Sequence, residues 1–477
     1  MESVLILLPL VMAALALIVP SNYWRPWLLP FTALIHTGAT LAVILHPEWG
    51  SQTVWLKLDP VGTIILLTVS VLYLFSAFYA VGYLHFRRER PNRIFCASLL
   101  AFLGLVSLAI WAHHLGLMWV AIEGTTLVTA PLIYFNHTPR SIEATWKYLV
   151  VGSVGIALAL LGTFFLAYAA MQGGFTASLN FMDLLKQAPG LSKIWFRAAF
   201  ILMLVGYGTK MGLAPMHTWK PDAYGEASGV VGGIFAGGIT SGAFLALLRI
   251  YQIGNAAGES QFMAGLLIFM GLFSMAVAGI FMISQRDIKR MLAYSSVEHM
   301  GILALGLGLG GPALFGTLLH VINNAMTKGL LFLSAGNIHR AYASKSTDQV
   351  RGALRRLPLS GALFLAGFLA ITGSPPFAPF ISEFSILNSA FSLEHFWAGG
   401  LFLGFLFLVF IGMGITVLKV VQGRVPEDVE ESPYKDSFLT AAPILAFMAI
   451  VLGLGLYIPD FLQSLLRAAV SFLENQG

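Results

Sequence analysis

The chain has 477 residues, of which 57% are hydrophobic and only 10% are charged. A mean hydropathy of +0.81 and apolar runs from end to end exclude a soluble globular protein and indicate an all-α polytopic membrane protein. The pI near 9.2 would suit a nucleic-acid-binding protein. However, the basic residues lie in short segments between apolar runs, which the positive-inside rule explains better.

The first apolar run has no basic residue before it and no convincing small-residue cleavage site. We therefore expect it to be the first of about fourteen transmembrane helices and not a removed signal. The expected spans are 4–19, 26–45, 60–84, 94–112, 115–134, 143–171, 196–216, 228–250, 261–284, 291–310, 312–338, 358–391, 396–418 and 438–457.

Lysine and arginine are distributed unequally between the two sides of the expected bundle. Of 27 such residues, 19 lie in the segments that follow odd-numbered spans, a set that includes Lys220, and 6 lie on the other side. The remaining two, Lys210 and Lys328, lie within spans. This bias predicts a protein of the cell inner (cytoplasmic) membrane with the odd loops in the cytoplasm and both termini outside.

The fifth and sixth spans carry the first acidic residues at or near membrane depth. Glu123 lies in the middle of LGLMWVAIEGTTLVTAPLI. It is either a neutral, hydrogen-bonded carboxylic acid or the partner of Lys210. Glu143 and Lys147 are four residues apart near the cytoplasmic end of the sixth span. Their spacing fits an interfacial ion pair as well as a role in proton uptake.

The seventh span runs into Lys210 and meets Pro215 five residues later. Lysine at membrane depth is costly, so it persists mainly where it faces protein, water or a partner charge. Proline removes a backbone donor and opens the helix, and the freed groups must line a cavity or be buried in protein. An opened helix beside a group that can lose its proton predicts a proton path. His217 and Asp222 follow in the expected loop.

The tenth and eleventh spans are unusually polar. The tenth opens on Ser295, Ser296, Glu298 and His299. Its histidine could carry protons near neutral pH or could be a satisfied packing group. In the eleventh, His320, Asn324 and Lys328 are spaced i, i+4 and i+8 on one face. Such a stripe can hold helices together, but the lysine within it favours a function.

The twelfth span is also broken by proline. Pro375 and Pro376 interrupt it, and Glu383 follows. Two broken spans that stand five spans apart run in opposite directions, as an inverted repeat of five-helix units requires; coincidental prolines are the alternative. The expected divisions are three N-terminal spans (1–93), a first repeat (94–250), a second repeat (261–418), and a final part (419–477).

The final part begins with the longest polar stretch, from Lys419 to Asp436. It holds four acidic residues and is expected to be a cytoplasmic loop; these are Glu427, Asp428, Glu430 and Glu431. One further span follows. The residues after Pro459 form a short amphipathic segment that could lie at the membrane interface.

The sequence carries few residues of the kinds that hold metals or cofactors. The single cysteine, Cys96, excludes a self-contained iron–sulfur site. The eleven histidines lie mostly at span ends, which disfavours haem held between spans. No P-loop, zinc spacing or nucleophile elbow occurs. The sequence therefore predicts neither a metal site nor a cofactor in this chain.

Several stretches, in fixed order, resemble a known family. GTKMGLAPMHTWKPDAYGEAS, DIKRMLAYSSVEHMG, LLHVINNAMTKGLLFLSAG and SPPFAPFISEF resemble the antiporter-like subunits of respiratory complex I, multisubunit sodium/proton antiporters and membrane-bound hydrogenases. WVAIEGTTLV and SIEATWKYLVVGSVGIALALLGT are most similar to component F of hydrogenase-4 and formate hydrogenlyase-type complexes. The resemblance runs from about Asp59 to Lys419. It implies two inverted five-helix bundles in which the seventh and twelfth helices are broken.

The resemblance also implies a proton path. Its members, matched by position, are Glu123, Lys210, His299, His320, Lys328 and Glu383, the last near the outer exit. The chain departs from the family pattern at Ser241, Asn324, Lys220 and Tyr224. Ser241 stands where many relatives have a lysine or histidine that bridges the two half-channels. The central connection therefore either runs through water or is weak in this member.

Residues and resemblance together predict a proton-translocating subunit of a redox-driven, hydrogenase-like complex. Separation of Lys210 from Glu123 would favour release of its proton in a desolvated site. The partners would be other membrane subunits and, through them, iron–sulfur and catalytic subunits. One alternative is a sodium/proton antiporter component without a redox partner, although sodium needs clustered oxygen ligands. Another is a purely structural subunit.

Overall fold

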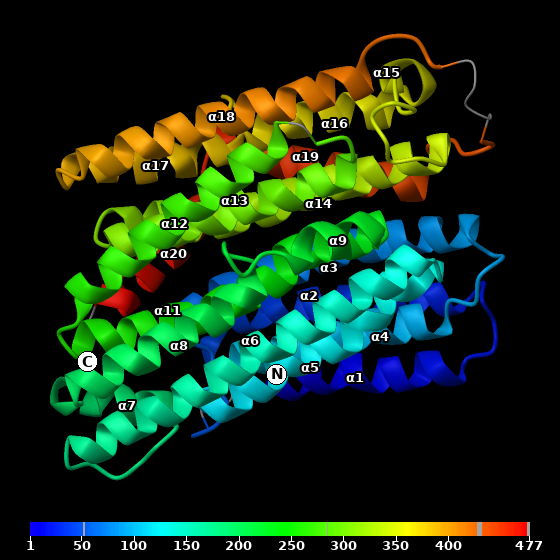
Figure 1. The fold of residues 1–477 in the computed structure, drawn as a ribbon. Coiled ribbons are helices and arrows are strands. Elements are labelled where there is room, and N and C mark those ends of the chain that lie inside the picture. Colours follow the sequence, from blue (N-terminus) through cyan, green and yellow to red (C-terminus); the bar gives the residue numbers. More distant parts are fainter. Residues whose placement is uncertain (51–52, 284, 427–431, 475–477) are drawn as a thin grey trace.

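The computed structural model describes residues 1–50, 53–283, 285–426 and 432–474. Within these residues the fold is all-α, and the long helices lie roughly parallel across the molecule (Figure 1). Eleven helices of the described residues are long and apolar enough to cross a membrane. The predicted fold class, an all-α polytopic membrane protein, is confirmed.

The long helices follow the order of the predicted spans. The N-terminal group is α1 (Glu2–Ile18), α2 (Leu28–Leu45) and α3 (Pro60–Phe86). The segment 94–250, called the first half below, contains α4 (Arg93–Trp111), α5 (Leu115–Ile133), α6 (Pro139–Gln172), α8 (Lys193–Met211), α10 (Gly229–Ile234), a π-helical turn (Phe235–Ile239) and α11 (Thr240–Ala256).

The segment 261–418, called the second half, contains α12 (Ser260–Met282), α13 (Ile288–Leu309), α14 (Ala313–Tyr342), α16 (Pro358–Ile371), α17 (Ala378–Ser392) and α18 (Phe396–Val421). The last long helix is α19 (Phe438–Leu456). Shorter helices are α7 (Phe181–Gln187), α9 (Trp219–Glu226), α15 (Ala353–Arg356) and α20 (Asp460–Glu474).

In the part of the chain that the structure describes, eleven helices qualify as spans by length and composition, against the fourteen expected. The other three expected spans also have helices in their place. Helix α1 has 17 residues, α14 has 30 residues with a polar stripe, and α16 and α17 lie on either side of a break. The order of the predicted spans is therefore reproduced, whereas the predicted number of fourteen is not confirmed.

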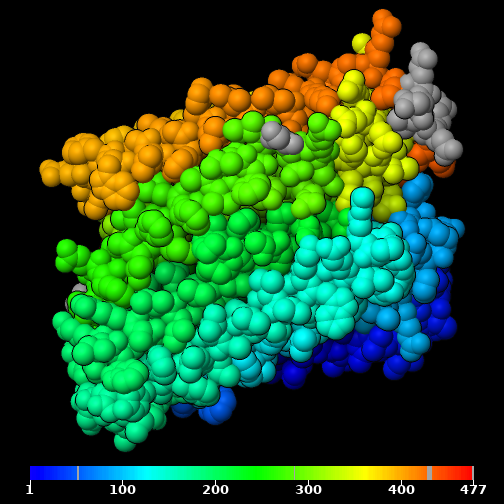
Figure 2. All heavy atoms as spheres, in the orientation of Figure 1, coloured from blue at the N-terminus to red at the C-terminus, as the bar shows by residue number. Residues whose placement is uncertain are grey.

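The two halves meet along the middle of the molecule. Figures 1 and 2 show α5 and α6 towards one edge and α17 and α18 towards the opposite edge, with green residues between them. Helix α9 contacts α13, and α10 contacts α14. The most apolar 18-residue window is 100% buried both in the span from Gly229 to Ala256 and in α13. Polar groups on these helices are therefore enclosed by protein and not exposed to lipid.

Close packing of α6 on α8 sets the position of the end of α8. A Cβ atom at Gly206 would lie 2.6 Å from the backbone nitrogen of Ala159 and 2.6 Å from the carbonyl oxygen of Gly155. Only glycine allows the two backbones to approach so closely, as is common where helices cross in membranes. This contact places Lys210, one turn further along α8, against α6.

The C-terminal residues form the amphipathic helix that the sequence indicated. Leu462, Leu466, Ala469 and Leu473 are the buried residues of α20. Their spacing places them on one face, and α20 packs against α3, α11 and α14. The apolar face of α20 is therefore buried against other helices of this chain. The predicted acidic loop residues Glu427, Asp428, Glu430 and Glu431 lie outside the described residues.

A buried ion pair joins the N-terminal helices to the first half. Asp59 caps α3 by accepting a hydrogen bond from the backbone N–H of Gly62 at 2.6 Å. Its other oxygen accepts one from Arg249 on α11 at 2.9 Å, and both side chains are 2% exposed. The Arg249 guanidinium also donates to the carbonyl of Ile110 at 2.8 Å. One pair therefore links α3, α4 and α11.

Replacing Asp59 with asparagine is expected to destabilise the chain by roughly 3–5 kcal/mol, since it leaves Arg249 buried without its counter-charge. The measurement is thermal unfolding of the purified chain in detergent. The pair of Arg87 and Glu89 supplies the control. Because the Glu89 side chain is 59% exposed, Glu89→Gln should cost less than about 1 kcal/mol. Equal, small effects of the two substitutions would show that the buried pair contributes little.

Candidate functional site

The centre of the site is the broken end of α8. The helix ends at Met211, one residue after Lys210, and Gly212 follows in the left-handed conformation with φ +80°. The break continues through Pro215 to residue 218, and α9 begins at Trp219. The peptide bond before Pro215 is cis. The break thus lies directly beside Lys210.

Helix α9 occupies the segment expected to be a loop, and that expectation is wrong. Trp219 donates through its indole N–H to the carbonyl of Thr209 at 2.9 Å, so it holds the start of α9 against the end of α8. His217 is buried in the break, and Asp222 lies on α9. Lys220 is 0% exposed. Lys220 therefore lies inside the protein and not among the cytoplasmic loop residues expected from the sequence.

Lys210 is 1% exposed and forms hydrogen bonds with two hydroxyl groups. Its ammonium donates to Thr126 Oγ1 at 2.5 Å and to the hydroxyl of Tyr148 at 3.2 Å. Thr126 in turn donates to Glu123 Oε2 at 3.0 Å. Ser153 donates to the other oxygen of Glu123 at 2.7 Å. The site is a hydrogen-bonded chain from an ammonium, through a hydroxyl, to a carboxylate.

The expected pairing of Lys210 with Glu123 is therefore not a direct contact but runs through Thr126. Among the described residues, no carboxylate oxygen lies within 4 Å of the Lys210 ammonium, and Thr126 stands between the two charges. Because a hydroxyl can accept and donate at once, it can couple the groups while keeping them apart. Glu123 is only half-buried, whereas the lysine is enclosed.

A charged cavity of about 440 Å³ opens near this site at the end of α6. Lys147 binds Glu143 at 2.6 Å, as the spacing of the two residues suggested, and also Asp222 at 2.8 Å. Asp222 pairs with Arg290 of α13 at 2.9 Å. Tyr148, which contacts Lys210, directly follows Lys147 in the sequence. Residues from both halves therefore line this cavity, and one of them, Lys147, is next in the sequence to the Tyr148 that contacts Lys210.

In the second half, Lys328 of α14 is 0% exposed and donates to Ser295 of α13 at 2.6 Å. Glu298 and His299 follow on the same face of α13, three and four residues later. Both side chains are buried, and Glu298 Oε2 lies 3.9 Å from His299 Nε2. The structure thus places the lysine of the eleventh span next to the polar start of the tenth.

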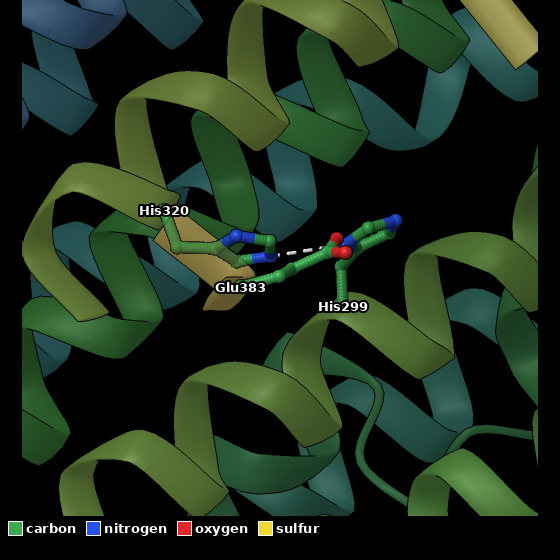
Figure 3. Close-up of side chains that lie close together, drawn as sticks. All are labelled: His299, His320 and Glu383. Carbon is green, nitrogen blue, oxygen red and sulfur yellow. Dashed lines mark hydrogen bonds between the residues drawn. The ribbon is translucent and has the colours of Figure 1, made fainter. Parts of the chain in front are cut away.

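The second group of predicted residues meets beyond this point (Figure 3). His299 Nδ1 and His320 Nε2 lie 2.9 Å apart, within hydrogen-bond distance. The other ring nitrogen of His320 lies 2.9 Å from Ser382 Oγ. Glu383, the next residue on α17, has its carboxylate beside both imidazoles (Figure 3). Three helices therefore supply one continuous polar cluster.

The break between α16 and α17 positions Glu383. Helix α16 ends at Ile371, and Gly373 has φ +67°. The cis bond between Pro375 and Pro376 follows before α17 begins at Ala378. A Cβ atom at Gly373 would lie 2.2 Å from Glu383 Oε2. Glycine at this turn is what makes room for the carboxylate.

The cluster of His299, His320 and Glu383 is also the group that could hold a metal ion. One ligand atom from each lies within 4.8 Å of the others. Histidine nitrogens and a carboxylate oxygen would suit zinc or another first-row divalent ion. The two imidazoles are in direct hydrogen-bond contact, which leaves no space for a haem iron between them.

Two positions at the centre carry no titratable group. Ser241 donates to the carbonyl of Gly237 in its own helix at 2.5 Å. Asn324 donates to the carbonyl of Ala236 in the π-helical turn at 3.4 Å. Neither side chain joins the charged groups of the two halves through a hydrogen bond among the described residues.

Several residues of the site were not identified from the sequence. The hydroxyl groups of Thr126, Tyr148, Ser153 and Ser382 connect the predicted charges. Their positions carried usable signals in two cases: Thr126 lies three residues after Glu123, on the same helical face, and Ser382 precedes Glu383. Tyr148 and Ser153 require knowledge of how α6 packs, which the sequence alone does not supply.

Known proteins are similar to this chain in sequence and in fold. The transmembrane family described as NADH:quinone oxidoreductase/Mrp antiporter matches residues 112–416. A hydrogenase-4 component F homolog of Methylacidiphilum infernorum (isolate V4) is 37% identical over 359 residues, which cover 74% of each chain. The sequence resemblance to this group of subunits is thereby confirmed.

Two solved structures have the same fold. A chain of the Mrp complex from Dietzia sp. DQ12-45-1b aligns with a TM-score of 0.88 and 20% identity, over 99% of this chain and 97% of that chain. A chain of respiratory complex I from Thermus thermophilus with bound NADH aligns with a TM-score of 0.84 and 22% identity, over 100% of both chains. This multi-pass membrane protein is an antiporter-like subunit and belongs to the NADH:quinone oxidoreductase/Mrp antiporter transmembrane family.

Proposed function

We propose that this chain carries protons across the membrane as a subunit of a redox-driven, hydrogenase-like complex. The observation that carries the proposal is a row of buried titratable side chains in an otherwise apolar interior. Lys210, Lys328, His299, His320 and Glu383 are each no more than 4% exposed. Charged groups at membrane depth are expensive, so a row of titratable groups through the buried interior indicates an ion path.

In the first half, Thr126 couples the cation to Glu123. A proton on Lys210 is stabilised by the nearby carboxylate and by the negative end of the α8 dipole. Movement of Glu123 away from Thr126 removes part of this stabilisation in a desolvated site, which favours release of the proton. The cavity beside Lys147 supports proton uptake from that side, with Glu143 and Asp222 at its rim.

In the second half, the hydrogen bonds form a relay. A neutral imidazole donates through one nitrogen and accepts through the other, so a proton taken up on one side can be given up on the other. His299 and His320 are in contact, and Ser382 lies on the far side of His320. Lys328 supplies the proton and Glu383 receives it before the exit.

The proposal includes an orientation and partners. The excess of basic residues on one side supports cytoplasmic odd-numbered loops and both termini outside, in the cell inner membrane. The breaks after Met211 and Ile371 each have a left-handed glycine, which supports inverted repeats over 94–250 and 261–418. The relatives are subunits of multisubunit assemblies, so this chain has membrane partners. Electron chemistry belongs to iron–sulfur and catalytic subunits reached through them.

The proposal is tested with inverted membrane vesicles from cells that contain the complex. Addition of the electron donor in sodium-free medium is expected to acidify the lumen, as reported by a pH-sensitive dye, and a protonophore should abolish the signal. Vesicles that lack this chain serve as the control. If the acidification requires sodium, or if sodium alone dissipates an imposed pH gradient, the chain is a sodium/proton antiporter component and the proposal is wrong.

A further inference from the structure

A third buried lysine lies between the two halves. Lys220 on α9 is 0% exposed, and among the described residues no carboxylate pairs with it. Its ammonium donates to the carbonyl of Met211 at 2.5 Å and to Ser296 Oγ of α13 at 2.9 Å. A buried ammonium without a counter-ion is costly, so its presence needs a physical reason.

One reason is local. Met211 is the last residue of α8, and a cation near a helix C-terminus satisfies a free carbonyl and interacts favourably with the helix dipole. The backbone makes room for this contact, because a Cβ atom at Gly212 would lie 2.5 Å from Lys220 Cδ. This explains one of the two hydrogen bonds. It does not explain why the same ammonium reaches across to the second half.

The second hydrogen bond leads to the site of Lys328. Ser296, which accepts from Lys220, is adjacent to Ser295, which accepts from Lys328 at 2.6 Å. Two buried lysines, one from each half, thus donate hydrogen bonds to consecutive serines of α13. Serine hydroxyls can donate and accept at once, and two ammonium groups so placed repel each other in a low-dielectric interior.

On the first-half side, Lys220 is bound to the residue that follows Lys210 in the sequence. Ser241 of the eighth span bonds only to its own helix and has no titratable group. Among the described residues, Lys220 is the titratable side chain with hydrogen bonds to both the break of α8 and the start of α13.

We propose that Lys220 is the proton carrier that connects the two halves, in addition to capping α8. The inference rests on the proposed function. The Lys220 ammonium gives a proton to the Ser296 hydroxyl while that hydroxyl passes its own proton on towards a neutral Lys328. Lys220 then becomes a neutral amine, and Lys328 becomes the ammonium. A proton from the Lys210 site restores the charge on Lys220, so each cycle moves one proton from the first half to the second.

Substitution of Lys220 can distinguish a proton carrier from a residue that only caps α8. Lys220→Arg keeps a permanent cation that can donate to Met211 and Ser296, but a guanidinium does not give up its proton. The complex should assemble with unchanged thermal stability, whereas protons moved per electron should fall to the level of a Lys210→Met complex. The exposed Lys186 supplies the control, and Lys186→Arg should leave the ratio unchanged. A Lys220→Arg complex that moves protons at the unmodified ratio overturns the inference.

Ser296→Ala provides an independent test, because it leaves Lys220 and its bond to Met211 intact while removing the bridging hydroxyl. A lowered ratio supports the inference, and an unchanged ratio contradicts it. This variant decides the matter if Lys220→Arg does not assemble. If Lys210→Met blocks translocation but both central variants are normal, the proposed function stands and only the role of Lys220 falls. If Lys210→Met is also normal, the proposed function itself has failed.

Discussion

Replacing Lys210 with methionine is expected to give an assembled complex that still transfers electrons but no longer moves protons through this chain. Methionine keeps the length and apolar stem of the side chain and deletes the titrating group. Its loss leaves Thr126, Tyr148 and Glu123 without the cation they surround. Glu123 is only half-buried, so if it stays ionised the loss of its partner costs less than the roughly 3–5 kcal/mol of a fully buried pair. Glu123 can instead take up a proton, which limits the loss of stability.

Two further substitutions make the result specific. Lys210→Arg should fail nearly as completely, since guanidinium keeps its proton. Glu123→Gln should give a milder defect, because the amide oxygen can still accept from Thr126 but carries no charge to switch. Lys186→Met, at an exposed position, is the matched control and should behave as the unmodified protein.

The measurement is the number of protons translocated per electron in vesicles, with assembly followed on native gels. The number of protons per electron should fall by the number that this chain translocates in the unmodified complex. If the assembled Lys210→Met complex translocates at the unmodified ratio, Lys210 is a structural charge and the switch described above does not exist.

Much of this architecture could be predicted from residue patterns. Apolar runs located the helices because a bilayer demands about 20 apolar residues per span. Lysine and glutamate within such runs identified Lys210, Lys328 and Glu383, since a charge in an apolar helix is a strong anomaly. Proline located both breaks, at Pro215 and at Pro375–Pro376, because the missing N–H cannot continue the helix.

The errors have a common physical origin. Helix α9, with the sequence WKPDAYGE, is polar, and hydropathy cannot distinguish a polar helix enclosed by other helices from an exposed loop. Lys220 was for this reason counted with the cytoplasmic residues, although it is fully buried. The pairing of Lys210 with Glu123 was inferred from charge alone. Whether a hydroxyl stands between two charges depends on how α5, α6 and α8 pack, which one sequence does not reveal.

The relay in the second half can be interrupted at His320. His320 is buried between His299 and Ser382, with a ring nitrogen 2.9 Å from each. Replacement by glutamine keeps a side chain of similar size that can donate and accept hydrogen bonds. An amide, however, does not take up and give up a proton near neutral pH, so the path to Glu383 is cut while the packing is kept. General acid–base groups typically accelerate proton transfer about a hundredfold or more, and passage through this chain should slow by a similar factor.

The measurement is the rate of lumen acidification at a matched rate of electron transfer. The control is His46→Gln, because His46 is exposed and its side chain contacts Glu48 and Trp49 of the same surface segment. Glu383→Gln should cause a comparable loss, since its carboxylate is the last group of the cluster and glutamine cannot carry the proton onward. His299→Gln should do the same from the other side of His320. The three residues act in series, so the double variant His320→Gln with Glu383→Gln should be no slower than the slower single variant. If instead the two defects multiply, or if His320→Gln acidifies the lumen at the unmodified rate, the protons leave by a route that does not pass through this cluster.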